Sequence, residues 1–165
     1  MRKKIVNPES LNVPARQLTK LDGELDIANL ATVLVTSEDT AHPIENAFSP
    51  QRGAGSDYWA AANPGMQTIM LAFDRPQSIR TIRLEIEETE VERSQALHFQ
   101  ASSDGGQTFT DVLRQEYNFS PSGTTLQQET WTVNLENITH LRLDIKPDMG
   151  DRPAVAKITS LALSA

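Results

Sequence analysis

The sequence predicts an all-β protein, built as a sandwich of antiparallel sheets. Apolar residues alternate with polar ones in four separate segments, a period typical of strands with one buried face. No segment longer than a few residues shows the period of an amphipathic helix. Two sheets made of such strands can bury their apolar faces against each other, which favours a sandwich. The four segments are residues 82–86, 97–101, 131–135 and 141–145.

Four further segments have the length and composition of strands and complete the predicted sandwich: residues 31–36, 67–73, 108–113 and 158–163. A short helical turn is the one helical element that the pattern allows, between residues 18 and 30. Residues 1–24 are predicted to form an N-terminal arm that is partly disordered. Residues 25–165 form one domain, because a chain of 165 residues buries roughly 70% of its surface in a single core.

Composition and the N-terminal sequence predict where in the cell the protein lies. With 38% hydrophobic and 22% charged residues the chain suits a globular domain. Its apolar runs are far shorter than the roughly 18 residues of a spanning helix, so no membrane span is predicted. The basic start is followed by Asn7, Pro8 and Glu9 instead of an apolar signal core. Together with the absence of cysteine, which fits a reducing compartment, this predicts a cytoplasmic protein.

The net charge of −7 argues against nucleic acid as a partner. Binding to nucleic acid draws most of its affinity from Lys and Arg at the phosphates. The 15 basic residues of this chain are scattered. Only Arg2, Lys3 and Lys4 are adjacent, and this trio is predicted to be a solvated tail.

Strand order predicts where the connections lie. If each strand reverses direction, successive connections fall alternately at the two ends of the sandwich. One end then receives the short connections 74–78, 103–106 and 136–140. The other, the long-loop end, receives residues 38–58, 87–94, 115–128 and 147–155. Binding residues are often carried by loops on a rigid scaffold, so the long-loop end is the predicted working surface.

The order of several motifs resembles that of discoidin, or coagulation factor 5/8 C-type, domains. The motifs are ATVLVTSE, PIENAF, YWAAANPG, QTIMLAFDRPQSIRTIRLEI, LHFQASSDGGQTFTDVL, LRLDI and AVAKITSLAL. They cover about residues 31–163. That group belongs to the galactose-binding-domain-like superfamily, which includes family 32 carbohydrate-binding modules. The resemblance implies a jelly-roll β-sandwich that binds its ligand at the loop-bearing end and does no chemistry.

The resemblance also implies roles for single residues. Phe48 of Asn46-Ala47-Phe48 would anchor the first long loop by being buried, and Trp59 would belong to the core. Many relatives have Asp-Gly after Asn-Ala-Phe and a glutamate near the last strand, both of which help to hold a structural calcium. This chain has Ser49-Pro50 and Ser160 there. Calcium takes six to eight oxygens, several of them anionic, so a structural calcium is disfavoured, and neither a cofactor nor a metal site is predicted.

Catalytic patterns are scarce, and the protein is predicted not to be an enzyme. The histidines His42, His98 and His140 are far apart in sequence. The sequence contains no H-E-x-x-H, G-x-S-x-G or G-x-x-x-x-G-K motif. A solvated acidic loop is favoured over a general acid/base pair for the carboxylates Glu87, Glu88, Glu90 and Glu92.

A sugar site combines apolar walls with a few placed polar groups. The long-loop end offers both kinds of side chain. The aromatic candidates are Tyr58, Tyr117 and Phe119, and the polar candidates are His42, Arg52, Asn118 and Arg152. For Tyr117 and Phe119, burial in the loop's own small core is an equal alternative. The sequence therefore predicts a carbohydrate-binding module with these seven candidate residues.

The alternative is an intracellular protein-interaction or adaptor domain, a use that the resemblance also implies. The four long connections carry 11 acidic residues against three arginines, a net charge of −8. Such a surface would steer a basic protein partner. A saccharide remains the first expectation, since sugar binding is the commoner use that the resemblance implies.

Overall fold

The computed structural model describes residues 1–5, 23–150 and 152–165. Almost all regular structure in them is strand, so the predicted all-β class is confirmed. The strands are β1 (Arg2–Ile5), β2 (Ala31–Val35), β3 (Trp59–Ala60), β4 (Gln67–Glu87), β5 (Arg93–Ser102), β6 (Thr110–Phe119), β7 (Leu126–Lys146), β8 (Lys157–Ile158) and β9 (Ser160–Ser164). The helices are the single turn α1 (Ile27–Leu30) and the 3-10 helix η1 (Ile44–Phe48).

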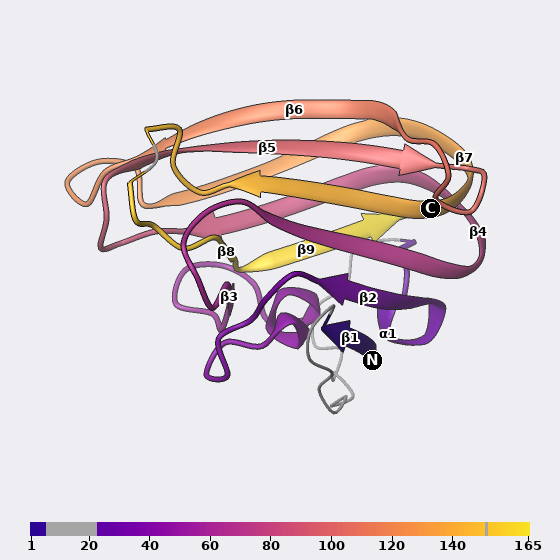
Figure 1. The fold of residues 1–165 in the computed structure, drawn as a ribbon, viewed down its shortest axis with the longest axis horizontal. Coiled ribbons are helices and arrows are strands. Elements are labelled where there is room, and N and C mark those ends of the chain that lie inside the picture. Colours follow the sequence, from indigo (N-terminus) through magenta and orange to yellow (C-terminus); the bar gives the residue numbers. More distant parts are fainter. Residues whose placement is uncertain (6–22, 151) are drawn as a thin grey trace.

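Two long strands, β4 and β7, run through both layers of the sandwich (Figure 1). The first half of β4 pairs with β2 and with the second half of β7. The second half of β4 pairs with β9 and with the first half of β7. The predicted turns at 74–78 and 136–140 are therefore corners inside continuous strands. Pairing persists through these corners at Gln77 and Ile138, with register shifts on either side.

The larger layer continues from β7 to β5 and β6, and β1 lies at its opposite edge. β1 was not predicted, and it pairs with β2 in parallel, unlike the antiparallel pairs of the other described strands. Lys3 in β1 is only 8% exposed. Its ammonium donates to Glu38 at 2.9 Å and also bonds Glu45. The prediction of a solvated tail is wrong for Lys3, because these two carboxylates offset the burial of its charge.

The short helical turn predicted between residues 18 and 30 is confirmed by α1, although residues 18–22 lie outside the described ranges. Residues 6–17 of the predicted N-terminal arm also lie outside them. No helix in the described part of the chain is long and apolar enough to cross a membrane.

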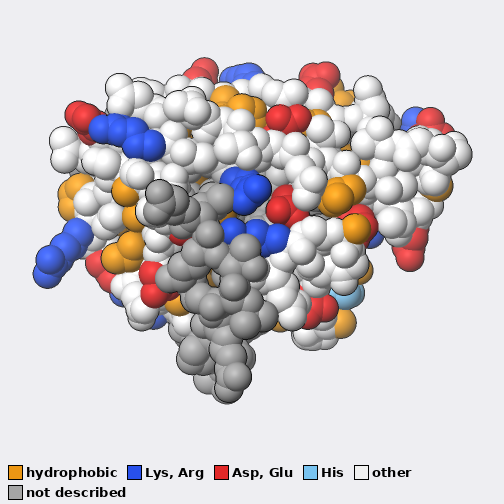
Figure 2. All heavy atoms as spheres, turned by 180° about the vertical axis from the view of Figure 1, so that it is seen from behind, with side chains coloured by type: hydrophobic (Ala, Val, Ile, Leu, Met, Phe, Trp, Pro, Cys, Tyr) orange, Lys and Arg blue, Asp and Glu red, His pale blue; other side chains and the backbone are white. Residues whose placement is uncertain are grey.

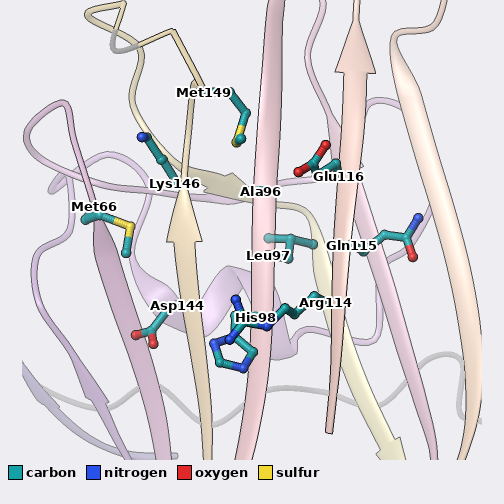
Figure 3. Close-up of a pocket in the computed structure, with 10 residues that line it drawn as sticks. All are labelled: Met66, Ala96, Leu97, His98, Arg114, Gln115, Glu116, Asp144, Lys146 and Met149. Atoms are coloured by element: carbon teal, nitrogen blue, oxygen red, sulfur yellow. The ribbon is translucent and has the colours of Figure 1, made fainter. Parts of the chain in front are cut away.

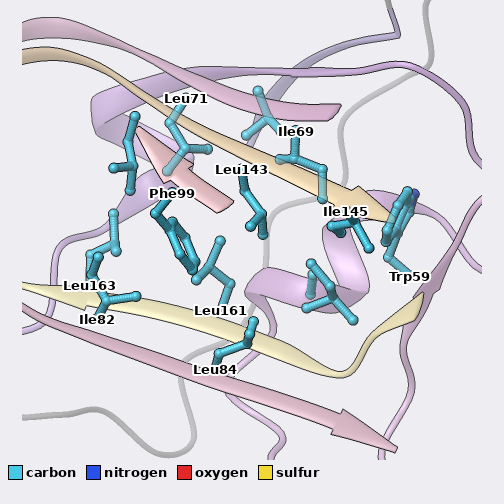
Figure 4. Packing of buried hydrophobic residues seen from close by; sticks show 14 of the residues in the cluster. Trp59, Ile69, Leu71, Ile82, Leu84, Phe99, Leu143, Ile145, Leu161 and Leu163 are labelled. Atoms are coloured by element: carbon cyan, nitrogen blue, oxygen red, sulfur yellow. The ribbon is translucent and has the colours of Figure 1, made fainter. Parts of the chain in front are cut away.

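The core fills the space between the two layers (Figure 4). Trp59 and Phe99 are fully buried there, which confirms the prediction for Trp59. The indole N–H of Trp59 donates to the Ser37 carbonyl at 3.1 Å, so the ring buries its apolar surface without losing a hydrogen bond. Phe48 is only half-buried, and Ile44 and Ala47 of η1 take the buried positions instead. Phe48 still packs against the core, so its predicted anchoring role is confirmed in part, with incomplete burial.

The long connections all leave from one end of the sandwich, as predicted (Figure 1). The strand register shows this directly. Arg93 at the start of β5 lies opposite Phe119 at the end of β6. Glu87 at the end of β4 lies opposite Leu126 at the start of β7. The loops also bond one another: the Met149 N–H donates to the Ser94 carbonyl at 2.6 Å.

Candidate functional site

Strand β6 is longer than predicted and takes in residues up to Phe119. Side chains on a strand alternate between its two faces, so Tyr117 and Phe119 both point into the sandwich. They are 5% and 1% exposed, with ring centroids 6.5 Å apart. The prediction that these two rings are exposed stacking platforms is wrong, and the alternative of burial holds. Asn118 between them faces outward and is exposed.

A hollow of about 310 Å³ lies at the long-loop end, formed by residues from several segments. We call it the loop-end hollow. Three sequence-predicted residues line it: Asn118, Phe119 and Arg152. The residues that sequence reasoning missed are Glu92, Arg93, Ser94, Ser120 and Thr124.

Two polar side chains of the loop-end hollow are held in place by hydrogen bonds. The Asn118 Oδ1 accepts from the Ser94 hydroxyl at 2.6 Å, which leaves the amide nitrogen of Asn118 as a donor. The Arg152 guanidinium donates to the Glu92 carbonyl at 2.9 Å and stays 58% exposed. Both groups therefore present donors to the hollow from fixed positions.

Asp148 anchors the loop that carries Arg152. Its carboxylate accepts the backbone N–H groups of Arg152 at 2.9 Å and of Ser94 at 3.1 Å. These bonds favour the ionised form, so the pKa of Asp148 lies below its ordinary value. The carboxylate thus ties the loop of residues 147–155 to the start of β5.

Arg93 and Glu88 form a buried ion pair beneath the hollow. Arg93 is 1% exposed, and burial lowers its pKa although Glu88 opposes this. The Arg93 Nε lies 3.2 Å from the Glu88 carboxylate, and the guanidinium lies 5.8 Å from the centroid of the Phe119 ring. Glu88 is also 3.2 Å from the Lys157 ammonium. The prediction of a solvated acidic loop is therefore wrong for Glu88, because Arg93 and Lys157 pair with its buried carboxylate.

His42 and Tyr58 form a second cluster at the same end. Their rings stack at 4.1 Å between centroids, with an interplanar angle of 13°. The Lys157 ammonium lies 5.5 Å from the Tyr58 ring centroid. Tyr58 is half-buried and already stacked, so it is not a free platform for a sugar. The cluster connects to the loop-end hollow through Lys157 and the buried Glu88.

Arg52 lies apart from both clusters. Its guanidinium pairs with Glu24 at 2.5 Å, and its side chain is 11% exposed. It lines a different small hollow, together with Glu24 and Leu161. Within the described residues, its Nε and Nη1 atoms have no hydrogen-bond partner. The structure therefore does not bring Arg52 to the loop-end hollow.

The positions that resemble a calcium site do not fit that ion. Ser160 is buried beside Glu85, whose carboxylate accepts the Gly53 N–H at 2.7 Å. Among the described residues, no group of three or more acidic or histidine side chains is placed to hold a metal.

Part of the acidic charge of the long loops is buried or paired, while Asp39, Asp57, Glu90, Glu92 and Glu116 stay exposed. Glu38 and Glu45 bind Lys3, Glu88 binds Arg93, and Asp148 is 3% exposed. Asp151 lies outside the described residues. On the face shown in Figure 2, positive side chains are interspersed with negative ones. A count of loop charges therefore overstates the acidic surface that a basic partner would meet.

Comparisons with known proteins give structural matches but no sequence matches. The chain matches no protein-family model and no curated protein. It is similar to the module CBM32-3 from a family 31 glycoside hydrolase of Clostridium perfringens, with a TM-score of 0.62 and 17% identity, over 87% of this chain and 95% of that one. It is also similar to the family 32 module of C. perfringens NanJ, solved in complex with galactose, with a TM-score of 0.58 and 14% identity, over 87% and 98%.

A third similar structure is chitosan-binding module 1 from the chitosanase/glucanase of Paenibacillus sp. IK-5. The TM-score is 0.52 and the identity 18%, over 84% of this chain and 98% of that one. At such identities the likeness shows the fold. The protein has the jelly-roll β-sandwich fold of these carbohydrate-binding modules, as the resemblance in motif order implied.

Proposed function

We propose that this protein is a non-catalytic carbohydrate-binding module that holds a saccharide in the loop-end hollow. The observation that carries the proposal is the convergence of Asn118 and Arg152 on one concavity above the buried Phe119. A few polar groups at fixed positions in a concave site orient a ligand and give it specificity. Of the similar structures, the NanJ module was solved with galactose and the Paenibacillus module is named as chitosan-binding, which supports a saccharide ligand here.

The hollow suits hydroxyl recognition. The Asn118 amide and the Arg152 guanidinium donate, and the hydroxyls of Ser120 and Thr124 both donate and accept. Ser94 and Glu92 hold the two donors in place before a ligand arrives. Such preorganisation reduces the entropy lost on binding.

The lining also supports a binding role without catalysis. Glycoside hydrolysis ordinarily uses two carboxyl groups on either side of the scissile bond. Among the described residues that line the loop-end hollow, Glu92 supplies the one carboxyl group. We therefore infer binding without bond cleavage.

The test is a titration with galactose, N-acetylglucosamine, glucose and mannose, followed by backbone amide NMR shifts. Asn118→Ala and Arg152→Ala should each weaken binding about tenfold, the effect of losing a hydrogen bond of about 1.4 kcal/mol. The matched controls Asn134→Ala and Arg75→Ala change exposed residues elsewhere and should leave affinity unchanged. Shifts that map to other surfaces, or wild-type affinity in both site variants, would overturn the proposal.

A further inference from the structure

A second and larger hollow, of about 660 Å³, lies on the outer face of the larger layer (Figure 3). We call it the sheet-face groove. It reaches from Met66, next to β4, across β7 and β5 to Glu116 on β6. Four neighbouring strands span roughly 14 Å at the usual spacing of about 4.8 Å. This is longer than a single pyranose ring.

The strand register explains why this groove exists. Ala96 on β5 lies opposite Lys146 on β7 and Glu116 on β6. A small side chain between two long ones leaves a depression, and Figure 3 shows Ala96 between Lys146 and Glu116. In the next row His98 lies between Asp144 and Arg114. Each row therefore places an acidic side chain on one side of β5 and a basic one on the other.

Exposed methionines border the same groove. Met66 is 63% exposed and Met149 is 43% exposed. Only one other large hydrophobic residue in the described part of the chain, Val91, is comparably exposed. Both methionines line the sheet-face groove. Exposed apolar groups that gather at one concavity are typical of binding surfaces, and thioethers adapt to ligands of varied shape.

A third hollow lies between the sheet-face groove and the loop-end hollow. An intermediate hollow of about 350 Å³ shares Met66 and Lys146 with the groove. The same intermediate hollow shares Arg152 with the loop-end hollow. Neighbouring hollows therefore extend from the loops onto the face of the sheet.

The charges along the groove favour neither an anionic nor a cationic ligand. An anionic chain would meet Glu116 and Asp144, and a cationic chain would meet Lys146 and Arg114. A neutral sugar can use both signs, because its hydroxyls donate to carboxylates and accept from ammonium or guanidinium groups. Its C–H faces can rest on Ala96 and against the methionines.

We propose that the three hollows form one trough that binds an extended neutral oligosaccharide, with one part of the chain in the loop-end hollow and further sugars over Ala96. This inference rests on the proposed function, which it deepens from sugar binding to the binding of a sugar chain. The ligand is therefore several residues long, and a terminal sugar alone fills only part of the site.

The test compares ligand lengths. Wild-type protein is titrated calorimetrically with galactose, glucose, mannose and N-acetylglucosamine and with their β-1,4-linked oligomers of two to six residues. For at least one series, we expect affinity to rise about tenfold or more from monomer to hexamer, as added hydrogen bonds accumulate. Oligogalacturonate and chitosan oligomers serve as anionic and cationic probes, and each should bind more weakly than a neutral oligomer of the same length.

Two variants test whether the gain in affinity with ligand length comes from the sheet-face groove. Ala96→Leu fills the floor of the groove and should remove the gain with length while leaving monosaccharide affinity intact. The double variant Met66→Gln, Met149→Gln changes exposed residues only and should reduce the same gain severalfold. The matched control is Ala72→Leu, on the outer face of β4 opposite His140, which should behave as wild type.

The outcomes separate the two proposals. Affinity that stays constant with chain length, or a length gain that Ala96→Leu retains, overturns the trough while the loop-end site stands. If either charged probe binds more tightly than a neutral oligomer of the same length, the proposal that the ligand is neutral is overturned. Failure of every saccharide to bind overturns the proposed function and the trough with it.

Discussion

Lys3 shows how one buried cation fixes the first strand to the sandwich. Its ammonium forms ion pairs with two carboxylates, Glu38 and Glu45, whose side chains are 6% and 11% exposed. We predict that Lys3→Met lowers the free energy of unfolding by about 3 kcal/mol, since breaking a buried ion pair leaves buried charge behind. Urea denaturation measures this. Arg2→Ala, which removes an exposed pair with Asp74, should cost much less. Equal losses would contradict the special role of Lys3.

The hydroxyl of Tyr117 is buried and has no hydrogen-bond partner in the described residues. Burial accordingly raises the pKa of Tyr117, because the phenolate would be poorly solvated. Removing an unsatisfied buried polar group stabilises a protein, so Tyr117→Phe should raise the free energy of unfolding by about 1 kcal/mol. Thermal denaturation alongside Tyr58→Phe provides the comparison. A clear loss of stability would mean that the hydroxyl is bonded, for example to a buried water.

At the scale of elements, the corner of β7 depends on one unusual residue. Asn137 has a φ of 55°, in the left-handed region that side chains with a Cβ rarely adopt. Asn137→Gly should therefore stabilise the fold by a few tenths of a kcal/mol, and Asn137→Ala should destabilise it by about 1 kcal/mol. Chemical denaturation of both variants measures the difference. If the two substitutions have the same effect, backbone strain does not control this corner.

Alternation predicted the strands well but not where they end. Leu113, Tyr117 and Phe119 continue the inward pattern of β6, but the polar Gln115 interrupts it in the sequence. The Pro and Gly residues that follow then made the whole segment look like a loop. The continuity of β4 and β7 was also hidden, because pairing through their corners depends on partners that are distant in sequence.

The candidate site could be predicted only in part, because contacts between distant segments are not visible in the sequence. Strand parity correctly placed Asn118 and Arg152 at one end, and both line the loop-end hollow. Ser94 was missed because its contact with Asn118 follows from the pairing of β5 with the extended end of β6. The burial of Glu88 could not be predicted from the sequence either, since Arg93 and Lys157 contact it only in the folded chain.

At the scale of the whole molecule, the two ends of the sandwich have separate electrostatic anchors. At the long-loop end, Asp148 accepts two backbone N–H groups and faces the cations Arg152 and Arg93. At the opposite end, Asp104 accepts bonds from Ser102, Gln107 and Thr108, which hold its pKa well below the usual range. Lowering the pH can therefore protonate both carboxylates, but only protonation of Asp148 should affect ligand binding.

Acid should weaken ligand binding through Asp148. Its folded-state pKa is depressed, so its stabilising effect is complete above the unfolded value of about 4 and is lost as pH falls through the folded value. As pH falls below about 4 towards this lowered pKa, Asp148 becomes protonated, the loop that carries Arg152 loosens and affinity for a neutral saccharide falls. Asp148→Asn should bind weakly at pH 7 with little further change in acid, when binding is followed by NMR titration with galactose or the tightest neutral sugar. Asp104→Asn, which alters only the far end, should keep the wild-type pH profile of binding while losing stability. A wild-type profile in Asp148→Asn would show that another group anchors this loop.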